Sequence, residues 1–242
     1  MSNLTKNSLI VIIGLYGLGL TNLSNSAVLV KEKRWHNHST LNVVFLNGEP
    51  ALHSKVKMLA PLWLEGTSLK FSFFDSLDTA PEDTHIRISF TSHNGSRLGA
   101  HGEYKSSFAT MNLADVMSQD ISERSIQRII LHEFGHALGL EHEYRNINWP
   151  YGQHIIEKFT EECIPRMRQI GHDPEVAEQR CHDINQSISK KLALTTAYDE
   201  RSIMNYPASF ALDNGMNKTI EATHTLSILD KHAIKRWYPK SP

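Results

Sequence analysis

The sequence contains no internal repeat and no low-complexity segment, so we expect neither a repeat architecture nor a low-complexity tail. It also lacks an excess of either charge, since the formal net charge is −1 at pH 7, and nothing therefore suggests a nucleic-acid partner. Cysteines are few, with two in 242 residues. What is present, a chain of this length with 40% apolar residues, is sufficient for one domain with a core of its own.

The longest apolar run, residues 9–20, is too short to span a bilayer comfortably. Lys6 gives it a positive start, and the small residues 24–27 offer a cleavage site, so residues 1–26 are predicted to be a secretory signal peptide. A retained anchor is the alternative, because the cleavage site lacks a clean A-x-A pattern. No cysteine directly follows the run, which argues against a lipoprotein.

Residues 132–142 read H-E-x-x-H-x-x-G-x-x-H, a spacing typical of a zinc site. At ~100° per residue in a helix, His136 lies only ~40° around the axis from His132, so both imidazoles point the same way. Glu133 lies ~60° from His136, beside the two histidines, which suits a base that acts on metal-bound water.

The third histidine of the motif cannot lie on the same straight helix. His142 would be ~15 Å further along the axis than His132, so the chain has to stop and turn back. Gly139 is the residue that can adopt the positive φ that this turn requires. Three nitrogen ligands leave one position of a zinc ion open for water, which is the arrangement of a catalytic rather than a structural site.

An alternative is an amphipathic helix that buries its histidines in an ordinary core. The helix does have an apolar face, formed by Ile126, Ile129, Ile130, Phe134, Ala137 and Leu138. However, the added glycine and third histidine make a chance match improbable, and of the fourteen histidines only these three have ligand spacing. The sequence therefore predicts one catalytic Zn²⁺ ion held by His132, His136 and His142.

The motif resembles that of the metzincin zinc endopeptidases, and Glu143, directly after the third histidine, resembles their astacin branch. A second segment, residues 202–207 (Ser-Ile-Met-Asn-Tyr-Pro), resembles the Met-turn of this group. Its tyrosine, Tyr206, follows Met204 by two residues, as in astacins. The resemblance implies that Met204 forms a hydrophobic floor beneath the zinc and that Glu143 bonds toward the mature N-terminus.

The resemblance covers most of the chain after residue 35, with departures near the site. Leu140 stands where astacins usually have Phe, and residues 144–148 replace an Arg/Asp-rich continuation. The chain thus resembles a divergent, microbial-looking astacin-like protease. We expect residues 34–242 to form its catalytic domain. The expected fold class is α+β and zincin-like: a mixed twisted sheet with an active-site helix and a backing helix up to Gly139, then an irregular lower half with a C-terminal helix.

Alternating and helical hydrophobic patterns predict where the elements lie. Strands are expected at residues 41–46, 69–74, 85–90, 97–100 and 108–113. Helices are expected at residues 56–63 with a bend or early end at Pro61, from Ser122 through the zinc motif, and at residues 155–167, 173–181 and 226–237. By resemblance, residues 97–100 would be the edge strand that pairs with an extended substrate.

Cys163 and Cys181 both lie in the long stretch that follows the zinc motif. In an exported chain they invite a disulfide, and two buried thiols are an equally open alternative.

The residues suggest a mechanism for peptide-bond hydrolysis. Zinc held by neutral imidazoles lowers the pKa of bound water to about 7, and Glu133 takes the proton of that water. Tyr206 is the candidate that stabilises the developing oxyanion, with an ordinary core tyrosine as the alternative.

We therefore expect a secreted, extracellular or periplasmic zinc-dependent endopeptidase. It would be a monomer that acts on protein or peptide substrates, without nucleic acid and without stable membrane association after signal cleavage. The alternative is a catalytically silent, zinc-bearing secreted binding protein or effector. The intact Glu133 argues against this alternative, because a binding protein has no need of a general base.

Overall fold

The computed structural model describes residues 27–169, 171–195 and 197–240. The predicted signal peptide, residues 1–26, lies outside the described residues. Among the residues that are described, no helix has both the length and the apolar character needed to cross a membrane.

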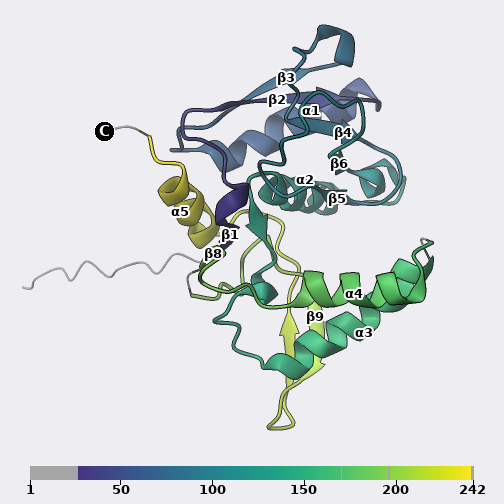
Figure 1. Ribbon diagram of the computed structural model, residues 1–242, viewed down its shortest axis with the longest axis vertical. Helices are drawn as coiled ribbons and strands as arrows, with labels where there is room; N and C mark the ends of the chain where they lie inside the picture. Colours follow the sequence, from purple (N-terminus) through teal and green to yellow (C-terminus); the bar gives the residue numbers. More distant parts are fainter. Residues whose placement is uncertain (1–26, 170, 196, 241–242) are drawn as a thin grey trace, which may run out of the picture.

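A five-stranded mixed sheet forms the upper part of the molecule (Figure 1). The strands are β2 (Thr40–Phe45), β3 (Lys70–Phe74), β4 (Ile86–Ser89), β5 (Gly95–Ser96) and β6 (Met111–Asn112). Their order is β3-β2-β4-β6-β5, and within this sheet only the edge strand β5 runs antiparallel to its neighbour. All four residues of β4 are buried, as expected for a central strand that is covered on both faces.

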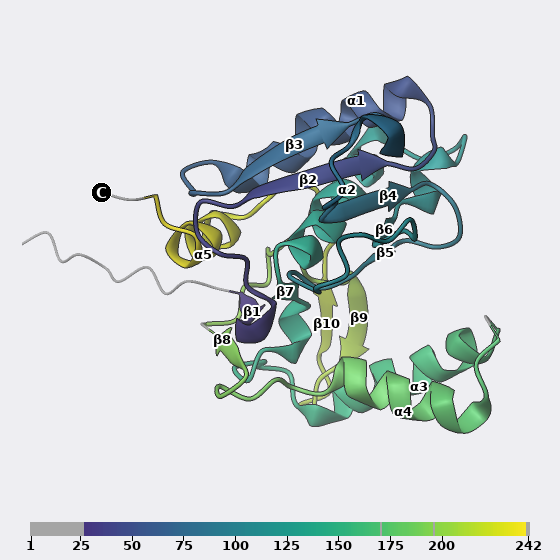
Figure 2. The ribbon, with the colours of Figure 1, turned by 45° about the horizontal axis from the view of Figure 1, so that its top comes forward.

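Two helices pack against this sheet and lie behind it in Figure 2. Helix α1 (Pro50–Leu59) has proline in its first turn and passes into a short 3-10 helix, Ala60–Leu64, at the second proline, Pro61. Helix α2 (Glu123–Ala137) begins after Ser122, whose Oγ accepts a hydrogen bond from the Ser125 amide at 3.1 Å. The predicted backing helix and active-site helix are therefore present.

The C-terminal half of α2 is held by side chains from three other parts of the chain. The indole N–H of Trp63 donates to the carbonyl of Leu131 at 2.8 Å, and that of Trp35 donates to the carbonyl of Ala137 at 2.8 Å. The hydroxyl of Tyr238 donates to the carbonyl of Leu138 at 2.8 Å. The bonds to Ala137 and Leu138 satisfy carbonyls at the helix end, where intrahelical partners are lacking, and the bond to Leu131 ties the helix interior to Trp63.

Below α2, the first described segment forms the centre of a small antiparallel sheet. Strand β1 (Val28–Val30) lies between β7 (Leu140–Glu141) and β8 (Ala193–Thr195). The folded part of the chain thus extends to Ala27, ahead of the start predicted at residue 34, because Ala27 and Leu29 are buried in the main core.

The lower part of the molecule contains a helical pair and a β-hairpin (Figures 1 and 2). The elements are α3 (Gln153–Gln169), α4 (Pro174–Asn185), β9 (Ala208–Ala211) and β10 (Asn217–Ile220). A disulfide joins Cys163 of α3 to Cys181 of α4, which decides between the two alternatives for these cysteines. The C-terminal helix predicted at residues 226–237 is present as α5 (Ile228–Trp237), but it packs against the upper part and not within the lower half.

The predicted α+β class with a mixed sheet is confirmed, but the predicted edge strand is misplaced. The edge strand is Gly95–Ser96, whereas residues 97–100 leave the sheet. Gly99 has φ +47°, its amide donates to the carbonyl of His136, and the Ala100 amide donates to the carbonyl of Lys33. Amides that bond these carbonyls cannot continue the ladder. The strand predicted at residues 108–113 is likewise confined to Met111–Asn112.

Candidate metal centre

Helix α2 and the turn after it bring the motif residues together. His132, Glu133 and His136 lie in the last two turns of α2, which ends at Ala137. Gly139 follows with φ +94°, the positive value that the sequence predicts for the reversal. Strand β7 then runs back along β1 and delivers His142 beside the other two histidines.

The Nε2 atoms of the three histidines converge on one point. The Nε2 atom of His142 lies 3.2 Å from that of His132 and 3.1 Å from that of His136. Four ligands placed tetrahedrally at the zinc–nitrogen distance of ~2.0–2.1 Å would lie about 3.3 Å apart. The spacing of these three nitrogens therefore fits three corners of a zinc coordination tetrahedron.

In His132 and His136, the hydrogen-bond partner of Nδ1 determines which ring nitrogen is protonated. The Nδ1 atom of His132 lies 2.8 Å from the Ile203 carbonyl oxygen, and that of His136 lies 2.8 Å from the Leu140 carbonyl oxygen. A carbonyl only accepts, so Nδ1 is protonated in both rings and each Nε2 presents a lone pair. Lone pairs that face one another at this distance repel unless a cation lies between them, which is the arrangement of metal ligands with oriented outer partners.

Burial favours the neutral form of these imidazoles. It lowers the pKa of His132 and of His142 well below the usual range, and it lowers the pKa of His136 as well. Metal binding requires neutral histidine, so the burial of the site and the ligand role act in the same direction.

Glu133 is buried beside the histidines, and no hydrogen bond from the described residues to its Oε2 atom offsets the cost of this burial. Burial raises the pKa of its carboxyl group to about 8. A cation at the three histidines would favour the carboxylate form, since an opposite charge nearby lowers a carboxyl pKa. The uncompensated carboxyl group therefore also fits a bound metal.

Residues 202–207 form a tight turn beneath α2. Met204 is fully buried, and a Cβ atom placed on Gly135 of α2 would lie only 2.3 Å from the Met204 sulfur. The turn is held by Asp230 of α5, whose carboxylate accepts hydrogen bonds from the Ser202 hydroxyl at 2.6 Å and the Ile203 amide at 2.9 Å. Met204 thus packs directly against the helix that carries the histidines.

Tyr206 lies at the histidines and is not a core residue. Its ring centroid is 4.5 Å from that of His142 and 5.5 Å from that of His132. Of the surface of the residue, 49% is exposed. Partial burial raises the pKa of its hydroxyl to about 12. The phenol is therefore protonated at neutral pH and can donate a hydrogen bond.

Glu143 is fully buried next to the site. Its Oε2 atom accepts hydrogen bonds from the Asn146 side chain at 3.3 Å and from the Asp199 amide at 3.4 Å. Burial, reinforced by the charge of Asp230, raises the pKa of its carboxyl group to about 8. Its expected bond toward the mature N-terminus stays a prediction.

The structure adds two residues that the sequence analysis did not single out. The Tyr144 hydroxyl lies 3.1 Å from Nδ1 of His142, and Asp230 supports the turn that bonds His132. Asp230 does carry a signal in the sequence, because Ser227 and Asp230 have the spacing of a capping box, and both bonds of that box form. No sequence rule identifies Tyr144.

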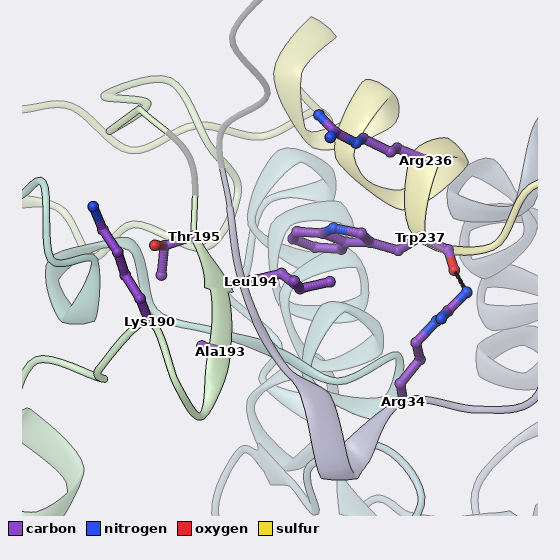
Figure 3. Close-up of a pocket in the computed structure, with 7 residues that line it drawn as sticks. All are labelled: Arg34, Lys190, Ala193, Leu194, Thr195, Arg236 and Trp237. Atoms are coloured by element: carbon purple, nitrogen blue, oxygen red, sulfur yellow. Dashed lines mark hydrogen bonds between the residues drawn. The ribbon is translucent and has the colours of Figure 1, made fainter.

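A separate hollow of about 500 Å³ lies between β8 and α5, and no residue of the histidine cluster lines it (Figure 3). Its cationic side chains do not converge. Lys190 points away from Trp237, and the guanidinium of Arg34 bonds the Trp237 carbonyl oxygen. The histidine cluster, and not the hollow, is therefore the candidate site for the chemistry of this chain.

No protein-family model and no curated protein matches the sequence. Two structures of myroilysin, a metalloprotease of the astacin family, are similar to this chain. One has a TM-score of 0.64 with 26% identity and covers 89% of this chain and 100% of its own. The other has a TM-score of 0.59 with 26% identity over 87% of each chain.

A third similar structure is a hatching enzyme zinc-protease from Oryzias latipes, the medaka fish, with a TM-score of 0.54. Its identity is 18%, over 86% of this chain and 96% of the other, so it supports the fold alone. The fold and the three convergent histidines define a metalloendopeptidase of the zinc-dependent class. More closely, the chain is similar in fold to the astacin-like metzincins.

Proposed function

We propose that this chain is an exported zinc endopeptidase in which His132, His136 and His142 hold the metal and Glu133 is the general base. The observation that carries the proposal is the convergence of three Nε2 atoms, with that of His142 at 3.2 and 3.1 Å from the other two. The buried carboxyl group of Glu133, which lacks a protein partner, follows His132 directly on α2.

When bound, the zinc ion supplies a Lewis acid for the scissile carbonyl and makes its water acidic near neutral pH. The remaining steps belong to the protein. Glu133 takes the proton from the attacking water and passes it to the leaving amine. Tyr206 donates its hydroxyl hydrogen to the oxygen on which negative charge develops. Met204 supports the histidines from below by its contact with α2.

A peptide substrate would bind in an extended conformation along the edge strand β5. One edge of β5 pairs with β6, and no other described strand pairs with its second edge. An extended chain can add itself to such an edge through main-chain hydrogen bonds. Because β5 is short, we expect it to contribute few bonds, with the lower part of the molecule selecting the side chains.

Export is supported by two features of the sequence and the fold. Residues 1–26 have the composition of a secretory signal peptide, and the catalytic domain would then comprise residues 34–242 together with β1, which lies between β7 and β8. The disulfide between Cys163 and Cys181 suits an oxidising compartment outside the cytosol. We propose a secreted monomer, extracellular or periplasmic, without stable membrane association after signal cleavage.

The competing function is a zinc-bearing binding protein or effector without catalysis. Such a protein would need the three histidines but not a carboxyl group held beside them. The burial of Glu133 costs free energy that a binding protein has no reason to spend. This feature favours the protease.

The test is proteolysis of casein by the purified protein, untreated, treated with a zinc chelator, and resupplied with zinc. We expect cleavage that the chelator abolishes and zinc restores. Glu133→Gln is the matched control, because it keeps the shape and burial of the side chain. It should retain one zinc per chain and lose ~10²–10⁴-fold in rate. Near-normal cleavage by the zinc-loaded variant, or no cleavage by the zinc-loaded parent, would contradict the proposal.

A further inference from the structure

The three histidines differ in the partner of their second nitrogen. Nδ1 of His132 and Nδ1 of His136 each bond a main-chain carbonyl oxygen, at 2.8 Å in both cases. Nδ1 of His142 instead lies 3.1 Å from the hydroxyl oxygen of Tyr144. A main-chain carbonyl persists whatever side chain is present, whereas the partner of His142 depends on one residue.

Tyr144 is held firmly where this bond forms. It belongs to a short 3-10 helix, Glu143–Arg145, that follows His142, and it is buried, with 5% of its surface exposed. Its ring stacks on the ring of His142, with 5.1 Å between centroids and 20° between planes. The ring also meets Phe159 of α3 edge-on at 5.4 Å and lies 6.2 Å from the ring of Tyr206, nearly parallel to it. The phenol therefore has little freedom to leave its place beside the imidazole.

His142 has a greater need of such support than the other two histidines. His132 and His136 lie on α2, whose hydrogen bonds fix their main chain. His142 lies after the two-residue strand β7 and before the 3-10 helix, outside regular structure. Rotation of its imidazole would move Nε2 away from the other two nitrogens, since ring orientation alone determines where that atom points.

We propose that Tyr144 is a positioning residue for the third metal ligand. Its hydroxyl oxygen accepts the Nδ1–H of His142, which leaves the lone pair on Nε2, and its stacked ring limits rotation of the imidazole. This inference rests on the proposed zinc site. Residues that orient a metal ligand typically contribute 10- to 100-fold to metal affinity, which sets the size of the effect.

Tyr144→Phe tests the inference, because it removes the hydroxyl and keeps the ring. The zinc dissociation constant, measured by competition with a chromophoric chelator at pH 7, should rise ~10–100-fold. Tyr151→Phe is the matched control: its hydroxyl bonds Glu200, and its ring contacts Trp149, Tyr198 and Phe210 rather than a histidine. This control should keep the zinc affinity of the parent. His142→Ala, which removes the ligand itself, should bind zinc more weakly than Tyr144→Phe.

Thermal unfolding of the zinc-free proteins separates positioning from simple stabilisation. We expect the zinc-free Tm of Tyr144→Phe to stay close to that of the parent while its zinc affinity falls. A variant with a lowered zinc-free Tm and unchanged zinc affinity would overturn the proposal, as would parental values of both. If the parent itself binds no zinc, the proposed function fails; if the parent binds zinc and cleaves casein but Tyr144→Phe binds zinc equally well, only the positioning role fails.

Discussion

The Nδ1 atom of His132 lies 2.8 Å from the carbonyl oxygen of Ile203, which joins the active-site helix to the turn before Met204. The main-chain amide of Ile203 donates a hydrogen bond to the carboxylate of Asp230 at 2.9 Å. One peptide segment thus connects a metal-site histidine to a buried carboxylate at the start of α5. The C-terminal helix therefore supports the site although none of its residues reaches the metal position.

Removal of this carboxylate is the first prediction. Asp230→Ala should lower the free energy of unfolding by ~3 kcal/mol or more, because buried hydrogen bonds to a charged group contribute ~1.5–3 kcal/mol each and the helix also loses its cap. It should also release zinc more readily, since the Ile203 carbonyl loses its support. Urea denaturation and zinc content after dialysis measure the two effects.

The control for this variant is Asp78→Ala, which changes an exposed aspartate in the short helix Leu77–Thr79. Its free energy of unfolding should stay within about 0.5 kcal/mol of the parent's. Equal stability of the two variants would show that Asp230 does not hold the turn.

The reversal after α2 gives the second prediction. Gly139 has φ +94°, and a Cβ atom there would lie 3.1 Å from the carbonyl oxygen of Lys33. Gly139→Ala should therefore lower the free energy of unfolding by at least ~1–2 kcal/mol, the cost of a left-handed conformation for a residue with a side chain. It should also weaken zinc binding, because the turn returns His142 to the site.

Gly171→Ala is the matched control for the backbone effect. Gly171 also has positive φ, +95°, but nothing lies within 4 Å of its Cβ position, and it lies between α3 and α4. It should show the stability loss without a change in zinc affinity. If Gly139→Ala bound zinc as tightly as Gly171→Ala does, the turn would not control the position of His142.

Acid sensitivity gives the third prediction, from a pair of histidines outside the metal site. Nδ1 of His85 accepts a hydrogen bond from the Asn42 amide at 2.9 Å, and Nδ1 of His101 accepts one from the Glu103 amide at 3.2 Å. Both bonds require a neutral imidazole. Burial lowers the pKa of both rings. The charge of Asp83 opposes this shift for His85, and the hydrogen bond to the His85 carbonyl opposes it for His101, while Arg87 adds to the lowering in both rings.

The folded-state pKa of these histidines is below the unfolded value, so the unfolded chain binds their protons more readily. Stability from this pair should therefore be complete above pH ~6.5 and fall as the pH drops below it. His85→Asn, which keeps an acceptor near the Nδ1 position but does not titrate, should lose less Tm between pH 7 and pH 5 than the parent does.

The variant has to be compared with the parent because Asp230 has the opposite effect on the pH dependence of stability. Burial raises the pKa of its carboxyl group to about 6, so its contribution increases as the pH falls through that value. Both proteins contain Asp230, so the difference between their curves isolates His85. His36→Asn, at an exposed histidine, should reproduce the parental curve. If the Tm of His85→Asn depended on pH as the parent's does, the His85–His101 pair would be excluded as the source of the acid sensitivity.

The parts of the molecule that the sequence predicts well are those determined by local spacing. The placement of His132 and His136 follows from helix periodicity, and the reversal at Gly139 follows from its lack of a side chain. The antiparallel hairpin β9–β10 was not predicted, although Asn214-Gly215 is a turn signal. Its strands are short and largely exposed, so they carry little hydrophobic alternation.

Tertiary contacts account for what the sequence could not reveal. The edge strand was misplaced because Gly99 and Ala100 bond main-chain carbonyls of distant segments, which no pattern within residues 97–100 encodes. Tyr144 was missed for a related reason. Its contact with His142 depends on how the chain leaves β7 and on Phe159 of α3, not on the spacing of the motif.

The last prediction concerns Tyr206, whose ring lies 4.5 Å from that of His142 and whose residue is 49% exposed. If its hydroxyl stabilises the oxyanion, Tyr206→Phe should lower kcat by roughly 10²-fold, as for other single oxyanion donors. KM should change little, because this bond forms mainly in the transition state. Tm should stay at the parental value, because the ring is kept and the residue is not part of the core.

Tyr198→Phe provides the comparison, because its hydroxyl contacts the Asn205 side chain beside the same turn and not a histidine. Loss of that hydroxyl should leave kcat within a few-fold of the parent's, since no charge develops near it during catalysis. A structural tyrosine at position 206 would instead lower stability by ~1 kcal/mol for a lost hydrogen bond and leave kcat intact. Steady-state kinetics and thermal unfolding on these two variants therefore decide the role of Tyr206, and an unchanged kcat in Tyr206→Phe would remove it from the mechanism.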